Sequence, residues 1–515
     1  MQLEQIVKAS TVVGATRSRT AKVNALAVAL RTARPDEVET ATAYLAGVLR
    51  QRRTGLGWRS LSDLPPPAAE SSLTIGEVHE TFESLGGVSG AGSRAARAAL
   101  VDRLFGRATD QEQVYLRKLV TGELRQGALD GLMLEAIAVA ADVPAAAVRR
   151  ASMLCGATIP VAVAALTEGE AGLARFGLEL GRPLRPMLAS SAADVAEAFA
   201  KAGPGGEEVA VDCKLDGIRI QVHKYDGHVA VFTRTLEEIT SRVPEVAEVV
   251  ADLPARTIVL DGEANAVDGN GRPRPFQETA ARTASKVDGT ALREKVPLTA
   301  YFFDLLHLDG VDLIDLPGRT RLAKLGDALP AGLIVPRRVT DRPAEATTFF
   351  EELVSRGHEG VVVKSLDAVY EAGRRGSAWV KVKPRHTLDL VVLAVEWGSG
   401  RRGSWLSNIH LGARDPDTGG FVMLGKTFKG MTDEMLRWQT QRFLELEESR
   451  SAHVVHLRPE QVVEIAFDGI QRSTRYPAGM ALRFARVLRY RDDKSADEAD
   501  TVDTVRALHA RPPAG

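Results

Sequence analysis

The sequence predicts a multidomain protein in which an all-α domain is followed by an α+β domain and then by a small β-barrel. The 515 residues suffice for about three domains at roughly 150 residues each. Ala and Leu recur every three to four residues up to about residue 175, as in helices, whereas apolar and polar residues alternate beyond residue 208, as in strands. Short apolar runs between Gly-rich turns fill the last part of the chain.

The first segment, residues 1–180, has the apolar spacing of packed helices, for example at Leu116, Leu119 and Val120. We expect it to end at the run Gly181-Arg-Pro-Leu-Arg-Pro-Met, because each proline disfavours helix in the residue before it. This run is therefore predicted to be an extended linker.

The second segment, residues 181–385, mixes strands and helices. The pattern has period two near residue 210: Val209, Val211 and Cys213 alternate with Glu208, Ala210, Asp212 and Lys214. This alternation predicts a strand with one solvent-facing side. An Asp-Gly turn at 226–227 predicts a hairpin. The predicted strands are 208–214, 218–223 and 228–234, and the predicted helices are 237–252 and 343–356.

The third segment, residues 386–505, is predicted to be the β-barrel. Its clearest strands are expected at 388–395, 421–424 and 462–466. The last residues, 506–515, end in Arg-Pro-Pro-Ala-Gly and are predicted to form a flexible tail.

Charge and cysteine content narrow the function. Lys plus Arg number 66 and Asp plus Glu 67, so the net charge of −1 supplies no bulk attraction for a polyanion, and any such site must come from local sorting of charge. Two cysteines, Cys155 and Cys213, cannot form a four-cysteine zinc site. Together with the absence of a signal-like start or a long apolar run, they predict a cytoplasmic protein with no membrane segment.

A candidate nucleophile lies in the run Asp212-Cys-Lys214-Leu-Asp-Gly217-Ile-Arg219. On a strand Asp212 and Lys214 share one face, and Gly217 permits a turn that returns Arg219 beside Lys214. A lysine is nucleophilic only when neutral, and nearby cations or burial favour that state. Lys214 is therefore a candidate for attack on phosphorus. The alternative is a solvated lysine on a surface hairpin.

Carboxylates at two predicted strand ends are candidates for binding Mg²⁺. Asp261 and Glu263 close one apolar run, and Glu359 precedes the run Val361–Val363. One or two carboxylates together with substrate phosphates usually hold this ion. Turn formation or structural pairing is the alternative.

Cations near residue 380 predict a phosphate site. In the run Trp379-Val-Lys381-Val-Lys383 both lysines project to one side while the valines face the core, and Arg375 lies close in sequence. Phe303 is either a core aromatic or a stacking platform for a purine.

The segment 472–494 is locally basic, with seven basic residues against two acidic ones. The basic residues are Arg472, Arg475, Arg483, Arg486, Arg489, Arg491 and Lys494. This is the local charge sorting that the neutral total requires, although a solvated strand face is the usual explanation of such a run.

Taken in order, these segments resemble the motifs of the covalent nucleotidyltransferases, and within them the ATP-dependent DNA ligases of the compact three-domain bacterial or archaeal kind. The resemblance covers nearly the whole chain. It is carried by Leu119-Val-Thr-Gly-Glu-Leu-Arg125, Gly181-Arg-Pro-Leu-Arg-Pro-Met-Leu-Ala189, Lys214-x-Asp-Gly-x-Arg219, Thr233-Arg234-Thr235-Leu-Glu237, Asp261-Gly-Glu263, Pro275-Phe-Gln277, Phe303-Asp304, Glu359-Gly360, Lys381-x-Lys383 and the segment 472–494.

The resemblance implies an architecture and an activity. Residues 1–180 would be a helical DNA-binding domain, 181–385 a nucleotidyltransferase (adenylation) domain and 386–505 an OB-fold. The implied enzyme seals nicks in duplex DNA with ATP and Mg²⁺ through a lysyl-AMP, during replication, repair or recombination. It would bind DNA mainly through phosphates, act as a monomer in the cytoplasm with the nucleoid, and rotate its barrel about a hinge at 383–387.

The resemblance also implies roles for single residues. Lys214 would become adenylated, and Asp212 would read the adenine amino group where the family usually has Glu. The other implied contacts are Arg219 and Arg234 to ribose or phosphate, Glu263 to ribose and metal, Phe303 to the adenine face, Glu359 to metal, Arg375, Lys381 and Lys383 to the α-phosphate, and Arg483, Arg486, Arg491 and Lys494 to the pyrophosphate.

Three departures from the usual family pattern fall in loops: Thr233 and Thr235 beside Arg234, Ala485 in place of a proline, and Phe428-Lys-Gly in place of T-G-F. Rival readings are an RNA ligase or a GTP-using capping enzyme, an NAD-dependent DNA ligase, and a non-catalytic DNA-binding scaffold. The long helical segment disfavours the first two and the two cysteines disfavour the third. The intact set Lys214, Glu263, Glu359 and Lys381 disfavours the last.

Overall fold

The structure is a computed structural model that describes residues 1–510 except 52, 125–129, 270–271, 275, 285–292, 294, 373–374, 385 and 400–401. The chain forms two compact units. The first comprises Met1–Ser190, Asp216–Pro336 and Lys364–Trp379. The second comprises Ser191–Leu215, Arg337–Val363 and the chain from Val380 onward. The predicted central segment, 181–385, thus contributes to both units.

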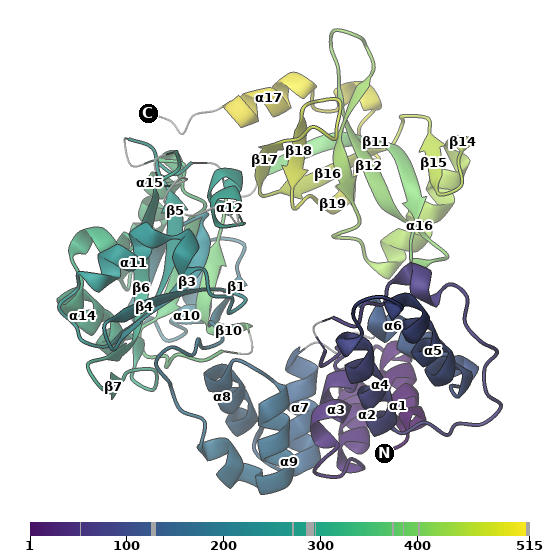
Figure 1. Ribbon diagram of the computed structural model, residues 1–515. Helices are drawn as coiled ribbons and strands as arrows, with labels where there is room; N and C mark the ends of the chain where they lie inside the picture. The colour runs from purple at the N-terminus through teal and green to yellow at the C-terminus, as the bar shows by residue number, and fades with distance from the viewer. Residues whose placement is uncertain are drawn as a thin grey trace. The chain divides into compact units, whose positions relative to one another are not determined.

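The helical part of the first unit confirms the predicted all-α domain (Figure 1). Its helices are α1 (Leu3–Ala15), α2 (Arg19–Arg31), α3 (Val38–Leu45), α4 (Ile75–Gly87), α5 (Ser93–Gly106), α6 (Asp110–Val120), α7 (Asp130–Ala141), α8 (Ala145–Cys155) and α9 (Ile159–Ala174). Thr74 and Thr109 begin α4 and α6 with capping boxes. Gly156, at φ 75°, ends α8 in the left-handed conformation that glycine adopts most readily. The helices pack around one apolar core.

The first unit also contains an antiparallel five-stranded sheet in the order β4-β3-β5-β6-β7. The strands are β3 (Ile218–Tyr225), β4 (His228–Thr233), β5 (Ile258–Ala266), β6 (Leu298–Leu308) and β7 (Val311–Asp312). Helices α11 (Pro244–Ala251), α12 (Phe276–Ala284) and α14 (Gly318–Ala328) accompany it. Asp226 and Gly227 both have positive φ, as the predicted hairpin turn requires.

The predicted helix 237–252 was placed too early. The α-helix begins at Pro244, where the fixed φ of proline suits the first helical turn. Glu238 instead pairs with Phe232 of β4 in an isolated antiparallel bridge, and a short 3-10 helix covers Thr240–Arg242. Tertiary pairing therefore overrides helical spacing over 237–239.

A second five-stranded sheet has the order β1-β10-β9-β2-β8. Its strands are β1 (Leu188–Ser191), β2 (Val209–Lys214), β8 (Arg337–Thr340), β9 (Gly360–Ser365) and β10 (Arg375–Val382), with helices α10 (Val195–Ala202) and α15 (Pro343–Ser355). The predicted solvent-facing side of β2 is wrong, because every residue from Val209 to Cys213 is buried. Strand β2 is an interior strand, and its one charged residue in this stretch, Asp212, is paired with an arginine described below.

The β-rich carboxyl-terminal part of the second unit is built around a seven-stranded antiparallel sheet. Its strands are β11 (His386–Trp397), β12 (Leu406–Arg414), β13 (Phe421–Thr427), β14 (Glu447–Arg450), β15 (Val454–Leu457), β16 (Val462–Phe467) and β19 (Arg486–Tyr490). Strands β17 (Gly469–Arg472) and β18 (Met480–Arg483) form a hairpin, and helix α16 (Asp433–Glu445) packs beside β12. The three strands predicted here all lie within observed strands.

The predicted tail, 506–515, starts too early. Helix α17 runs from Val502 to Ala510, because Val505 is buried and Leu508 packs against the core of the β-rich part. Residues 511–515 lie outside the described residues. Within the described part of the chain, no helix is both long and apolar enough to cross a bilayer.

Candidate active site

The candidate nucleophile lies in the second unit, at the end of β2. Lys214 Nζ contacts the Glu359 carboxylate, and the Glu359 N–H donates a 3.2 Å hydrogen bond to the Lys214 carbonyl oxygen. Lys383 Nζ contacts the same carboxylate and lies 3.1 Å from Asp468 Oδ2. Burial works against the charge on Lys383, but these two carboxylates outweigh it and raise its pKa. The candidate nucleophile and one predicted phosphate-site lysine, Lys383, thus share Glu359.

A close backbone approach fixes Glu359 at the start of β9. The next residue, Gly360, has φ 135°, which L side chains rarely adopt. A Cβ atom at this position would lie 2.1 Å from the carbonyl oxygen of Val382 in β10. Only glycine therefore lets these two strands meet directly behind Glu359 and beside Lys383.

Asp212, expected to read an adenine amino group, is tied to an arginine. It is 2% exposed, and Arg337 Nη2 donates a 2.8 Å hydrogen bond to its carboxylate while Arg337 Nε contacts the other oxygen. Asp212 and Arg337 are register partners in the β2–β8 pair. The carboxylate is therefore charge-compensated without a ligand.

The remaining predicted α-phosphate residues lie on β10. Lys381 is half-buried between the buried Val380 and Val382, as the alternation predicts, and its carbonyl accepts a 3.1 Å hydrogen bond from Ala192. Strand β10 begins at Arg375, whose side chain lies outside the part of the chain that the structure describes.

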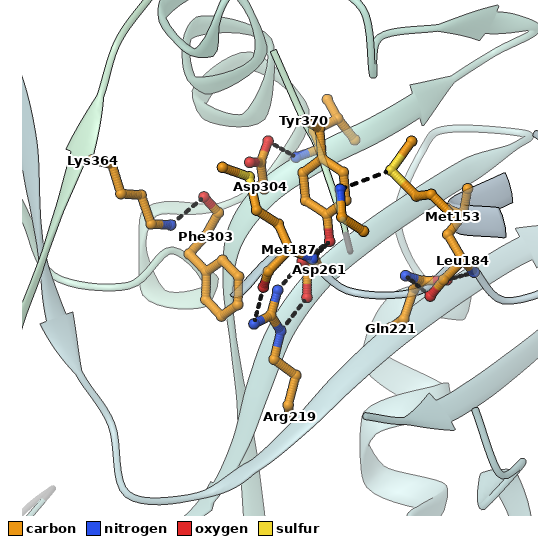
Figure 2. A network of polar contacts seen from close by, with 12 residues as sticks. Met153, Leu184, Met187, Arg219, Gln221, Asp261, Phe303, Asp304, Lys364 and Tyr370 are labelled. Atoms are coloured by element: carbon orange, nitrogen blue, oxygen red, sulfur yellow. Dashed lines mark hydrogen bonds and ion pairs between the residues drawn. The ribbon is translucent and has the colours of Figure 1, made fainter. Parts of the chain in front are cut away.

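In the first unit, Arg219 of β3 is held within a polar network (Figure 2). Its Nε and Nη2 donate hydrogen bonds of 2.9 and 2.6 Å to the two oxygens of Asp261, and its Nη1 donates a 2.9 Å hydrogen bond to the Met187 carbonyl oxygen. Burial opposes the charge on Arg219, but the Asp261 carboxylate outweighs it and raises the arginine pKa. Arg219, which was predicted to contact ribose or phosphate, is thus hydrogen-bonded to protein groups.

Phe303 of β6 forms an edge-to-face pair with Trp379, with ring centroids 5.9 Å apart. Two cations flank these rings. Arg219 Cζ lies 5.1 Å from the Phe303 centroid, and Lys364 Nζ lies 4.3 Å from Phe303 and 4.1 Å from Trp379. Phe303 is half-buried, so it is held from several sides while part of it stays accessible.

The predicted placement of Asp261 and Glu263 at a strand end is wrong. Both lie inside β5, which continues to Ala266. Glu263 Oε1 accepts a 3.2 Å hydrogen bond from Gly217 N–H, which ties the turn after Lys214-Leu-Asp to β5. The predicted strand end reflected the Asp-Gly pair, which the β5–β6 register accommodates with a bulge between Asp261 and Gly262. Arg234 is exposed in the turn after β4.

The four predicted pyrophosphate residues belong to the second unit. Arg486 lies 3.2 Å from Asp468, and Arg491 and Lys494 lie 2.9 and 2.7 Å from Asp389. Arg491 also pairs with Asp493 at 2.7 Å. Arg483 is half-buried at the end of β18, and its carbonyl accepts a hydrogen bond from Asp468 N–H. Two carboxylates, Asp389 and Asp468, thus gather three of these four cations.

Glu263 and Glu359 have the donor chemistry that suits Mg²⁺. Each is a half-buried carboxylate, and this ion needs only one or two such groups besides substrate phosphates. Within the described residues, no group of three or more His, Cys, Asp or Glu side chains is arranged to hold a metal by itself. Each of them, taken by itself, thus fits a substrate-assisted site, in which phosphates complete the ligand shell.

Sequence reasoning missed several residues of these networks: Lys364, Tyr370, Arg337, Asp389 and Asp468. Lys364 had a detectable signature, since it directly follows the apolar run Val361–Val363, and the structure buries it. Tyr370 had none, because it is a single aromatic residue in a loop. Of the quoted motifs, Arg125 and Pro275 lie outside the described residues.

Comparisons with known proteins agree with this arrangement. Sequence models described as "DNA ligase N terminus", "ATP dependent DNA ligase domain" and "ATP dependent DNA ligase C terminal region" match residues 48–138, 186–383 and 402–494. A "Probable DNA ligase" of a Nocardioides species is 64% identical over 511 residues, covering 98% of each chain. One of Beutenbergia cavernae is 63% identical over 513 residues, covering 99% of each chain.

The fold likewise has a solved counterpart. The structure named "Pmar-Lig_PreS3" matches with a TM-score of 0.61 over 94% of this chain and 99% of its own, at 18% identity. At that identity the match concerns the fold alone, which it supports along nearly the whole chain.

Proposed function

Because the chain belongs to the ATP-dependent DNA ligase family, we propose that Lys214 is the nucleophile through which it seals nicks in duplex DNA. The protein is an ATP-dependent DNA ligase, and ligases of this type act through an adenylate intermediate. The observation that carries the assignment is Lys214 at the end of β2, with its Nζ against Glu359 and the Gly217 turn directly after it.

The first step is adenylation of the lysine. Lys214 Nζ attacks the α-phosphorus of ATP, a P–N bond forms, and the bond to the β-phosphate oxygen breaks to release pyrophosphate. The ammonium must first lose a proton, because only the neutral amine is nucleophilic.

The two later steps act on DNA. A 5′-phosphate oxygen at the nick attacks the lysyl-AMP phosphorus, which frees Lys214 and forms a pyrophosphate link between AMP and DNA. The adjacent 3′-hydroxyl then attacks the DNA phosphorus, a phosphodiester forms, and AMP leaves. Because each step is an in-line displacement, the protein contributes mainly positioning and neutralisation of charge.

Charge neutralisation is assigned to Lys381 and Lys383 at the α-phosphate and to Arg483, Arg486, Arg491 and Lys494 at the leaving pyrophosphate. Bound substrate phosphates would replace carboxylates such as Glu359, Asp468 and Asp389 as partners of these cations. Glu263 and Glu359 are the residues proposed to bind Mg²⁺, which would further neutralise phosphate charge.

The base site is assigned to Phe303. Asp212 is assigned to the adenine amino group, a contact that requires its release from Arg337. Residues 1–180 are assigned to DNA binding, 181–385 to adenylation and 386–505 to an OB-fold. The partner is nicked duplex DNA, bound by a monomer mainly through phosphates.

Sealing of a fluorescently labelled nicked duplex in the presence of ATP and Mg²⁺ tests the proposal. We expect Lys214→Ala to lower the sealing rate by at least about 10³-fold, because the attacking atom is gone. Lys201→Ala is the control, since Lys201 lies on α10 of the same unit and its Nζ donates to Glu197 and to the Ser191 carbonyl oxygen, away from Lys214 in sequence. Undiminished sealing by Lys214→Ala would contradict the assignment.

A further inference from the structure

A closed cycle of hydrogen bonds joins four residues: Arg219, Asp261, Tyr370 and Met187 (Figure 2). Arg219 donates both to Asp261 and to the Met187 carbonyl oxygen. Tyr370 Oη donates a 2.6 Å hydrogen bond to Asp261 Oδ2 and accepts a 3.1 Å hydrogen bond from Met187 N–H. Each member is therefore bonded to two others, and the cycle joins β3, β5, the linker before β1 and the loop before β10.

The cycle lies in the protein interior. Asp261 and Tyr370 are each 1% exposed. Burial raises the pKa of the Tyr370 hydroxyl well above its usual range, and the Asp261 carboxylate raises it further. The hydroxyl therefore remains a donor to Asp261 under all physiological conditions. A buried carboxylate that loses such a donor is left with an unsatisfied oxygen, which carries a large penalty.

The cycle supports the two aromatic rings of the candidate base site. Arg219 Cζ lies 5.1 Å from the Phe303 centroid and 5.4 Å from that of Trp379. The Tyr370 ring packs edge-to-face against Trp379 at 5.9 Å, and Trp379 packs in the same way against Phe303. A shift of Arg219 or Tyr370 would therefore be transmitted to Phe303 through direct contacts.

We propose that Tyr370 is a positioning residue for nucleotide binding, whose hydroxyl fixes Asp261 and Arg219 and thereby sets the orientation of Phe303 toward the nucleobase. The inference rests on the proposed function, in which Phe303 stacks on adenine. Tyr370 itself touches neither substrate nor the reacting atoms. Loss of its hydroxyl is expected to raise the half-saturating concentration of ATP and to leave the chemical step at Lys214 unchanged.

The backbone around Tyr370 is held without the hydroxyl, so Tyr370→Phe is a clean variant. Tyr370 N–H donates to the Ile314 carbonyl oxygen at 2.9 Å, and Ala372 N–H donates to Met153 Sδ at 3.2 Å. Phe fills the same space, so the ring can keep its edge-to-face contact with Trp379 and its contact with Arg321, whose Cζ lies 5.9 Å from the ring centroid. Tyr115→Phe is the matched control, because Tyr115 is also buried and its hydroxyl also donates one hydrogen bond, to the Tyr44 carbonyl in the helical part.

The test compares two half-saturating concentrations in single-turnover reactions of the full-length protein. One is that of ATP in self-adenylation, and the other is that of pyrophosphate in the reverse reaction of the purified adenylated protein. We expect Tyr370→Phe to raise the value for ATP by about tenfold, the scale of a lost hydrogen bond to a charged group. The value for pyrophosphate should stay within about twofold, because the adenylate is already attached.

Asp261→Asn provides a second test through coupling. We expect it to raise the ATP value as well, and the double variant with Tyr370→Phe to fall short of the product of the two single effects, because both act in one cycle. A multiplicative combination would overturn the shared mechanism.

An ATP value equal to that of Tyr115→Phe and wild type would overturn the proposal. So would an equal rise in both values, since it would report a general loss of structure. If the wild-type chain formed no adenylate at all, the proposed function would fail and this inference with it. A wild type that adenylates beside an unchanged Tyr370→Phe would overturn the inference alone.

Discussion

At the scale of single residues, buried carboxylates matched by arginines recur around the candidate site. Asp212 pairs with Arg337, Asp261 with Arg219, and Asp304 with Arg321 at 2.8 Å. A buried charge without a partner is costly, so each arginine is needed wherever its aspartate stays ionised. Asp212 lies two residues before Lys214, and Asp304 directly follows Phe303. Their pairs with arginines therefore anchor the chain next to both candidate site residues.

The pair of Asp212 and Arg337 leads to a stability prediction. Arg337→Met removes the guanidinium and leaves a buried carboxylate uncompensated, so we expect the free energy of unfolding to fall by about 3 kcal/mol. Chemical denaturation followed by fluorescence measures this loss. Asp212→Asn in the Arg337→Met background should recover most of it, because the uncompensated charge is gone. A variant as stable as wild type, or one that the second substitution fails to rescue, would count against this reading.

Single residues were predictable from the sequence where their chemistry is local. Lys214 and Lys381 could be singled out from their spacing, and Phe303 was one of two alternatives. The partners of these residues could not, because Arg337 and Asp468 are distant in sequence and are joined to the site only by strand pairing and tertiary packing. The site roles of Lys214, Lys381 and Phe303 stay predictions, as do those of Glu263 and Glu359.

At the scale of secondary-structure elements, β3 fastens the linker between the helical part and β1. The fully buried His223 accepts a 3.1 Å hydrogen bond from Gly181 N–H at Nδ1, and its Nε2 contacts Gln221 Oε1 at 2.9 Å. Gln221 Oε1 also accepts a 2.7 Å hydrogen bond from Leu184 N–H. The ring is therefore neutral, with its proton on Nε2. A protonated Nδ1 would face the Gly181 N–H as a second donor.

We expect the attachment of the linker residues 181–184 to β3 to weaken as the pH is lowered. Burial, with a smaller contribution from His307, lowers the pKa of His223 to about 4, whereas an unfolded histidine titrates near 6.5. Between these values the unfolded state binds more protons than the folded state, so stability falls as the pH decreases from about 6.5 to 4. We expect hydrogen exchange at 181–184, corrected for its intrinsic pH dependence, to quicken across this window.

His223→Asn is the informative variant for that effect, because an amide oxygen can replace Nδ1 as the acceptor without titrating. Its exchange at 181–184 should depend less on pH than that of wild type. If wild type and variant responded to acid alike, His223 would not be the titrating group.

Most elements were predictable because their periods are local, but their burial was not. The hairpin at 226–227 follows from turn chemistry, and β11 and β16 follow from short apolar runs between turns. Strand β2 was expected to have a wet side, yet its place between β8 and β9 buries it fully. The start of α11 depended on Glu238 pairing with β4, a contact that helical spacing does not reveal.

At the scale of the whole molecule, the chain passes repeatedly between its two compact units. The crossings follow Ser190, Leu215, Pro336, Val363 and Trp379. Three of them lie next to sequence motifs: Lys214 precedes the second, Glu359-Gly360 precedes the fourth, and Lys381 follows the fifth. Three consecutive domains could be predicted from composition, but this interleaving of the central segment could not, because it depends on which distant strands pair.

At this scale the chain is close to neutral, with a net charge of −1, and many of its charged side chains form local ion pairs. Three of the seven cations of segment 472–494, namely Arg486, Arg491 and Lys494, are paired with Asp468 or Asp389. A phosphate ligand would compete with these carboxylates for the same guanidinium and ammonium groups. These three cations of the basic run are therefore held in ion pairs that a phosphate ligand could exchange.

The most direct test of the central claim is to follow the adenylyl group. The purified protein is incubated with α-³²P-ATP and Mg²⁺, freed of nucleotide and given nicked duplex DNA, and the label is traced on denaturing gels with peptide mapping of the modified residue. We expect AMP on Lys214 in wild type, none in Lys214→Ala, and loss of the protein label in step with joining of the nick. Label on another residue, or a lysyl-AMP that nicked DNA fails to discharge, would contradict the account.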